Sequence, residues 1–355
     1  MTLSSLAAYP APLPLPPGYE RHQPSAEQTA QAMTSLAGTH PWARLGWPEL
    51  IEALVALGRT DIPLGRLVEG HVDAIRILAQ ARRAPIADAR YAVWASQSQA
   101  TGIAARAARG GWRLDGTLRF ASGAGVVDRA LVSVLVDSTE RLLLDLDVGD
   151  WSADESAWQT TAMAVSRSHT IVLTDVCADA SAQVGPAGFY LGRPGFFPGG
   201  VGVAAVWAGG AARLADLVHD YVATGPPSPA RSRRLGQVRT ELAAMHAVLV
   251  AAGPVLGTAD GTGTAGCGAG RGSSAGEPAG RAGEDRPGDL RAVSTEVRAG
   301  VAAAVRRVVE LVRDLAGPAG RAYEQDLTHA IDDLDLYVRQ QNPDTDSEYL
   351  GDLPR

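Results

Sequence analysis

The spacing of apolar residues along the chain changes twice, and each change predicts a change of structure. Across residues 24–86, apolar side chains such as Leu64 and Leu67 recur every three or four positions, the period of an amphipathic helix. Across residues 87–185 the apolar segments are short, alternate with polar residues and are separated by Gly or Asp turns, as in β-strands. The helical period returns across residues 186–341. The sequence therefore predicts an α+β protein with N-terminal helices, an antiparallel β-barrel middle domain and a C-terminal four-helix bundle.

Three segments fall outside this pattern. Residues 1–23 contain many prolines and lack a charged start, so we expect a flexible lead-in rather than a signal peptide. Residues 253–289 carry almost no large apolar side chain, which predicts a disordered Gly-rich insertion within the bundle. Residues 342–355 follow the last helical segment and are expected to form a tail.

The composition narrows the classes of function. The formal net charge is −7, and all 32 basic residues are arginines, so no excess of positive charge predicts a nucleic-acid partner. The cysteines, Cys177 and Cys267, lie far apart without a CxxC spacing, which argues against a metal or redox pair. The most apolar stretch after the lead-in, residues 201–212, is too short to cross a bilayer. We therefore expect a cytoplasmic protein with no metal site, no nucleic acid and no membrane as partner.

The run RFASGAG combines an aromatic residue, a hydroxyl and two glycines. By itself it fits two structures, the end of a β-hairpin with a glycine-rich turn or a loop shaped to receive a planar ring. In the second structure Phe120 stacks on the ring and Ser122 offers a hydrogen bond. Gly123 and Gly125 would then let the backbone approach the ring closely.

Four segments together resemble the acyl-CoA dehydrogenase family of flavoproteins. They are GRTDIPLGRLVEGHVDA, YAVWASQSQATG, GWRLDGTLRFASGA and TAMAVSRSHTIVLTDV, and they occur in the family's order within residues 45–340. The family has an α-helical N-terminal domain, a β middle domain and an α C-terminal domain. The resemblance therefore implies the same fold for this chain, with FAD bound between the β-module and the bundle.

The resemblance also implies which residues contact FAD. Phe120 and Ser122 take the places of the family's Trp and Thr beside the flavin ring, which favours the ring-binding structure for RFASGAG. Ser96 falls at the Thr of a second motif, although the two residues after it depart from the family's Glu-Pro. In the family an arginine near the start of the second bundle helix reaches a neighbouring subunit's FAD, and we take Arg234 as the candidate. The arginines available there are Arg231, Arg233 and Arg234.

A catalytic base is implied too, but the residues that carry it in the family are absent. Tyr337 falls at the family's Tyr-Glu-Gly but is followed by Val-Arg-Gln, and no Asp or Glu occurs between Ala180 and Ala215. Asp332, Asp333 and Asp335 lie on the last predicted helix, where Asp332 and Asp335 share a face, and they are consistent with a relocated base or with a hydrated surface. Glu348 in the tail is a weaker candidate. The catalytic residue is therefore left unassigned.

The resemblance implies an FAD-dependent oxidoreductase that oxidises the Cα–Cβ bond of an acyl thioester or a related carbonyl compound. Two alternatives follow from the missing base. One is a flavin-dependent monooxygenase on the same scaffold, and the other is a non-catalytic binding protein whose cofactor site has decayed. The expected partners are an acyl-CoA or related small substrate, further copies of the chain in a homodimer or homotetramer, and an electron-transfer flavoprotein or a flavin reductase.

Overall fold

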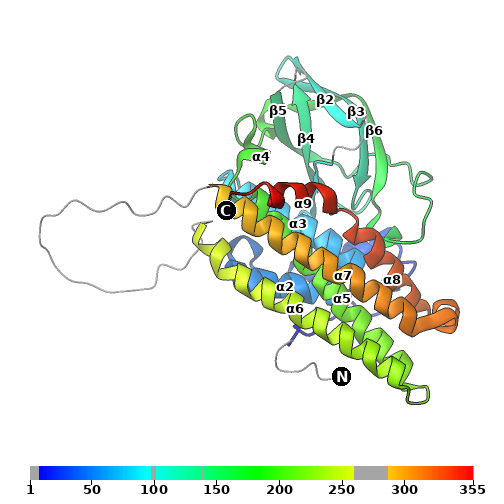
Figure 1. Cartoon of the computed structure of the whole chain (residues 1–355). Coiled ribbons are helices and arrows are strands. Elements are labelled where there is room, and N and C mark those ends of the chain that lie inside the picture. The colour runs from blue at the N-terminus through cyan, green and yellow to red at the C-terminus, as the bar shows by residue number, and fades with distance from the viewer. Residues whose placement is uncertain (1–7, 97–100, 137–139, 260–286, 355) are drawn as a thin grey trace, which may run out of the picture.

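The computed structural model describes residues 8–96, 101–136, 140–259 and 287–354. The strands gather at one end of the molecule and the long helices run beneath them (Figure 1). The helical segments before the sheet are α1 (Ala26–Ala37), η1 (Trp42–Arg44), α2 (Trp47–Thr60) and α3 (Ile62–Gln80). The strands are β1 (Tyr91–Trp94), β2 (Gly102–Ala108), β3 (Gly111–Ala121), β4 (Arg129–Val136), β5 (Glu140–Asp147) and β6 (His169–Asp179), with the short turns η2 (Ala164–Ser166) and η3 (Ala180–Ala182). The later helices are α4 (Phe189–Gly192), α5 (Phe196–Ala223), α6 (Pro229–Ala259), α7 (Pro287–Tyr323), α8 (Gln325–Val338) and α9 (Pro343–Gly351).

The described strands form one open six-stranded sheet in which β4 is central. It pairs antiparallel with β5 along one edge and parallel with both β1 and β2 along the other. Strand β3 continues the sheet from β2 to β6 through antiparallel pairs. The prediction of a wholly antiparallel barrel was therefore wrong, because alternation along a strand identifies the strand but carries no information about the direction of its neighbour.

Helix α3 lies between the sheet and the other helices and begins at a well-defined cap. The Asp61 side chain accepts a hydrogen bond from the Leu64 backbone N–H at 3.1 Å, and Pro63 occupies the first turn, where its missing N–H costs nothing. Most of the helix is buried, including the acidic residue Glu69. A charged side chain on a largely buried helix is unusual unless it has a partner or a function.

Helix α5 is the centre of the helical layer and packs against α2, α3, α6, α7 and α8. It crosses α2 so closely that a Cβ added to Gly58 would lie 2.0 Å from the Val206 carbonyl oxygen. The helices α5 to α8 do lie together, but the N-terminal helix α2 packs against α5 and α6 in the same layer. The expected division into separate domains therefore stays a prediction.

Two helices, α5 and α6, are long and apolar enough to cross a membrane by length and composition alone. In α5, 78% of the most apolar stretch is buried inside the protein, which is the burial of a core helix. In α6 the share is 39%, and Val248, Val250 and Val255 are exposed. The predicted homo-oligomer remains a prediction.

The expectation that residues 8–23 of the lead-in are flexible was wrong. The Tyr9 hydroxyl is buried and donates to the Leu242 carbonyl oxygen at 3.0 Å. Arg59 donates to the carbonyl oxygens of Tyr9 and Pro10 at 3.1 and 2.9 Å. Prolines restrict the unfolded chain, so less conformational entropy is lost when such a segment is ordered.

The boundaries of the Gly-rich insertion and of the tail also differ from those expected. Helix α6 continues to Ala259 because Leu256 is fully buried, although glycine and proline surround it in the sequence. Residues 260–286 lie outside the described residues. The expected tail contains α9, whose N-cap Asn342 side chain accepts from two backbone N–H groups of the first turn.

Candidate functional site

A pocket of about 610 Å³ opens between the sheet and the helices α3, α5, α7 and α8. This volume lies within the range of roughly 300–1,000 Å³ that small-molecule and cofactor sites occupy. Three of the four residues predicted to contact the cofactor line this pocket, Ser96, Phe120 and Ser122. The structure thus brings together side chains from β1 and from the end of β3 that the sequence could relate only through the family resemblance.

Phe120 lies at the rim of the pocket, with half of its surface exposed. Its backbone adopts φ 59°, a left-handed conformation that non-glycine residues rarely take. Its ring meets the edge of Trp158 at a centroid distance of 6.2 Å. An aromatic face held in a strained backbone at the mouth of a pocket is suited to stacking on a planar ligand.

Ser122 lies deeper and is anchored on both sides. Its carbonyl oxygen accepts from the Trp94 indole N–H at 2.9 Å, and the next residue, Gly123, donates its backbone N–H to the Ser166 carbonyl oxygen at 2.9 Å. A Cβ on Gly123 would lie 2.7 Å from Val127, and the backbone there has φ 82°. Glycine is therefore required at this turn, which holds the Ser122 hydroxyl in place.

Three serine hydroxyls form a hydrogen-bonded chain along the pocket wall. The Oγ atoms of Ser122 and Ser168 are 2.8 Å apart, as are those of Ser168 and Ser166. The Ser166 hydroxyl donates to the Met163 carbonyl oxygen at 2.7 Å. All three serines line the pocket.

The direction of this chain is fixed at its Met163 end. A carbonyl oxygen only accepts, and each hydroxyl has one hydrogen to donate. Ser166 therefore donates to Met163, Ser168 donates to Ser166, and Ser122 must donate to Ser168. The Ser122 Oγ is left with a lone pair, so toward a ligand it acts as an acceptor.

The remaining predicted cofactor residues have different positions. Ser96 is exposed at the end of β1, and residues 97–100 after it lie outside the described part of the chain. Arg234 on α6 does not line the pocket and pairs with Asp314 at 3.3 Å. Its expected contact is with a neighbouring subunit, so the assignment stays a prediction.

The acidic residue Glu69 lines the pocket on the α3 side and was not identified from the sequence. Its side chain is buried and accepts from Arg66 at 3.0 Å. Burial raises the pKa of Glu69 to about 7, and the charge of Arg66 only partly opposes this rise. A carboxyl group with such a pKa can hold or release a proton near neutral pH. The available signal was weak, a pair of opposite charges three residues apart on a helix that also carries Asp73 and Arg76.

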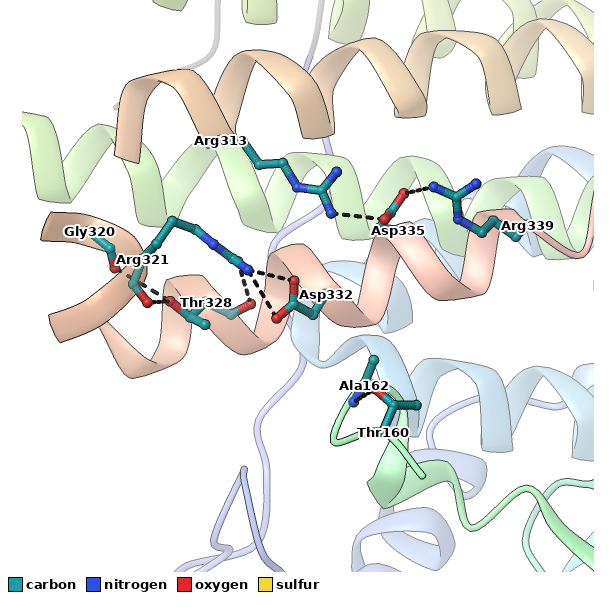
Figure 2. A network of polar contacts seen from close by, with 9 residues as sticks. All are labelled: Thr160, Ala162, Arg313, Gly320, Arg321, Thr328, Asp332, Asp335 and Arg339. Atoms are coloured by element: carbon teal, nitrogen blue, oxygen red, sulfur yellow. Dashed lines mark hydrogen bonds and ion pairs between the residues drawn. The ribbon is translucent and has the colours of Figure 1, made fainter. Parts of the chain in front are cut away.

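The carboxylates considered as relocated bases lie elsewhere. Figure 2 shows Asp332 of α8 pairing with Arg321, and Asp335 lying between Arg313 and Arg339. Neither aspartate lines the pocket. Asp332 and Asp335 thus lie in ion pairs on the helix surface, whereas Asp333 is largely buried and accepts from the Met163 backbone N–H at 2.5 Å.

Arg298 of α7 and Tyr337 of α8 both line the helical wall of the pocket. Trp207 of α5 contacts both side chains. The Arg298 guanidinium lies 5.6 Å from the Trp207 ring centroid, and the Tyr337 and Trp207 rings are nearly perpendicular with their centroids 5.9 Å apart. The Tyr337 hydroxyl and the Arg298 Nε are buried without a hydrogen-bond partner among the described residues.

No group of three His, Cys, Asp or Glu side chains among the described residues could hold a metal ion.

No protein-family model matches the chain, and no curated protein matches it. Solved structures do share its fold. Dibenzothiophene monooxygenase TdsC from Paenibacillus sp. A11-2 is similar with a TM-score of 0.71 at 12% identity, covering 92% of this chain and 88% of TdsC. XiaF from Streptomyces sp., in complex with FADH2 and glycerol, has a TM-score of 0.71 at 17% identity, covering 94% and 88%. The HsaA monooxygenase from M. tuberculosis has a TM-score of 0.71 at 12% identity, covering 93% and 90%.

These neighbours correct the identification as an acyl-CoA dehydrogenase, which was wrong. TdsC and HsaA are monooxygenases, and the alternative of a flavin monooxygenase fits the comparisons better than the oxidation of a CH–CH bond. The motifs that suggested the family describe the scaffold around a cofactor, and a shared scaffold does not determine the reaction. XiaF contains FADH2 and one TdsC structure contains FMN, so the neighbours support a flavin but not FAD in particular.

Proposed function

We propose that this chain is a flavin-dependent monooxygenase that binds reduced flavin in the pocket between the sheet and the helices. The observation that carries the proposal is the fixed direction of the serine chain, which leaves Ser122 as an acceptor toward the ligand. Reduced flavin supplies the electrons that activate molecular oxygen for transfer to a substrate.

The proton on flavin N5 distinguishes the two candidate reactions. Oxidised flavin, which a dehydrogenase must bind, has an unprotonated N5 that accepts hydrogen bonds. Reduction places a hydrogen on N5, which then donates. If N5 lies beside Ser122, as the family resemblance implies, Ser122 would be complementary to the reduced form, because it has already given its hydrogen to Ser168.

The other residues of the pocket support this assignment. Phe120 and Trp158 offer aromatic surface for a planar ring, and Glu69 can take or give a proton near neutral pH. We propose a separate flavin reductase as partner, because the described residues contain no βαβ unit that would bind a nicotinamide dinucleotide. We further propose a cytoplasmic homo-oligomer that acts on a small apolar or aromatic compound.

The substitution Ser168→Ala tests the proposal. It frees the Ser122 hydrogen, so Ser122 can then donate to oxidised flavin as well as accept from reduced flavin. We expect the wild type to bind reduced FMN more tightly than oxidised FMN, and the variant to lose roughly ten-fold of this preference, the effect of a hydrogen bond worth about 1.4 kcal/mol. Anaerobic fluorescence titrations give both dissociation constants, and a ten-fold change lowers the reduction potential of the bound flavin by about 30 mV.

Ser133→Ala is the matched control, because Ser133 is also a buried serine of the sheet but does not line the pocket. It should leave the preference unchanged. An equal preference in the wild type and in Ser168→Ala would refute the role of the serine chain. A protein that binds neither form of FMN or FAD would instead favour the non-catalytic alternative.

Phe120→Ala is expected to weaken the binding of both flavin forms to a similar extent, by roughly ten-fold, because ring stacking does not depend on the proton at N5. The same titrations measure this effect. If Phe120→Ala changed the preference between the two forms rather than both affinities, the ring would not stack on the flavin as proposed.

A further inference from the structure

We propose that the helical wall of the pocket is a subsite for the carboxylate of a small organic substrate, formed by the Arg298 guanidinium and the Tyr337 hydroxyl. The proposal that this ligand is the enzyme's substrate rests on the proposed function. The binding that it predicts can nevertheless be measured without flavin.

Arg298 differs from the other arginines that line the pocket. Arg66 pairs with Glu69 and Arg339 pairs with Asp335, each at 3.0 Å. Arg298 has no carboxylate within ion-pair distance among the described residues, and one Nη group donates to a backbone carbonyl at 3.3 Å. Burial lowers the pKa of Arg298, because the more distant negative groups compensate only in part for lost hydration. Its positive charge is thus available to a ligand.

Tyr337 supplies the second donor. Tyr337 lines the pocket and is 3% exposed, and its hydroxyl has no hydrogen-bond partner within the part of the chain that the structure describes. Burial raises the pKa of Tyr337 well above its ordinary value, so the hydroxyl keeps its hydrogen. Buried polar groups in native proteins are normally hydrogen-bonded, so a donor without a partner and a guanidinium without a carboxylate, both on one pocket wall, indicate a ligand that accepts.

A carboxylate matches this pair better than other acceptors. It carries one negative charge, and its two oxygens can accept from Arg298 and Tyr337 together. The neighbouring walls include Phe120 and Leu336, which favour an apolar or aromatic body on the acid.

Isothermal titration of the flavin-free protein with benzoate and with benzyl alcohol tests the subsite. The two probes have similar bodies and differ in charge. We expect benzoate to bind at least roughly ten-fold more tightly than benzyl alcohol, and Arg298→Met or Tyr337→Phe to reduce the affinity for benzoate roughly ten-fold or more. The affinity for benzyl alcohol should change far less. Arg313→Met is the control, because Arg313 lies on the same helix, pairs with Asp335 at 2.8 Å and does not line the pocket.

Benzoate that binds no better than benzyl alcohol, or equally well to the wild type and to both variants, would overturn the proposal. A second result would also overturn it: Arg298→Met loses affinity for FMN but keeps its affinity for riboflavin and for benzoate. The subsite would then bind the flavin phosphate. Thermal unfolding shows whether each variant is folded. If Arg298→Met does not fold, the result for Tyr337→Phe, which removes only one oxygen atom, decides the outcome. Failure to bind flavin would contradict the proposed function but leave the benzoate result intact.

Discussion

Replacing Gly209 with alanine is expected to lower the free energy of unfolding by about 3 kcal/mol. Gly209 of α5 faces α2, and a Cβ at this position would lie 2.1 Å from the Val55 carbonyl oxygen and 2.8 Å from the Arg59 backbone nitrogen. Both contacts are with backbone atoms, which cannot rotate away. The helices would have to separate, and the packing of the core around Trp207 would be lost with them.

Urea unfolding of Gly209→Ala and of Gly300→Ala gives the comparison. Gly300 lies on α7, where an added Cβ meets nothing within 4 Å, so alanine there should be neutral or stabilise by up to about 1 kcal/mol through its helix propensity. Equal stabilities for the two variants would show that α2 and α5 do not approach each other as described.

The substitution Asp333→Asn is expected to stabilise the protein at pH 8 by roughly 2–4 kcal/mol and to have little effect at pH 4. The Asp333 carboxyl accepts from the Met163 backbone N–H at 2.5 Å in a largely buried position. Burial, with a smaller effect of the nearby Asp61, raises the pKa of Asp333 to about 7 from an ordinary value of 3.8. Asparagine keeps the acceptor without the charge.

The sign of the effect follows from proton binding. Between about pH 4 and pH 7 the folded state holds a proton on Asp333 that the unfolded state has lost, so stability falls as the pH rises through this window. Glu69 also lowers the stability as the pH rises, and its contribution to the pH dependence of stability remains in Asp333→Asn. Urea unfolding across pH 4–8 measures the slope, with Asp332→Asn as the control on the ion-paired surface of α8. A slope in Asp333→Asn as steep as in the wild type would contradict the assignment.

The sequence was sufficient to find the parts of the site that are local in the chain. Phe120, Ser122 and Gly123 lie within one short turn, whose residue types alone fitted either a hairpin end or a ring-binding loop, and the family resemblance favoured the second. The change of hydrophobic period likewise located the strands and the long helices. The direction of strand pairing was missed, because β4 accepts β1 and β2 along the same edge through contacts that no local pattern encodes.

The helical wall could not be found in this way. Glu69, Arg298 and Tyr337 belong to three helices, and each has the local context of an ordinary amphipathic helix. The roles proposed for them rest on burial and, for Arg298 and Tyr337, on missing partners, and both features arise only when the helices pack. The reaction could not be assigned from the motifs for a related reason, because they describe the cofactor's surroundings and not the chemistry.

The ordered N-terminal segment has a practical consequence for producing the protein. A truncation at Pro24, which the proline content of the preceding residues invites, would remove Tyr9 from its buried position and take two acceptors from Arg59. Shortened versions designed to improve crystallisation should therefore retain residues 8–23, and affinity tags are better placed ahead of them.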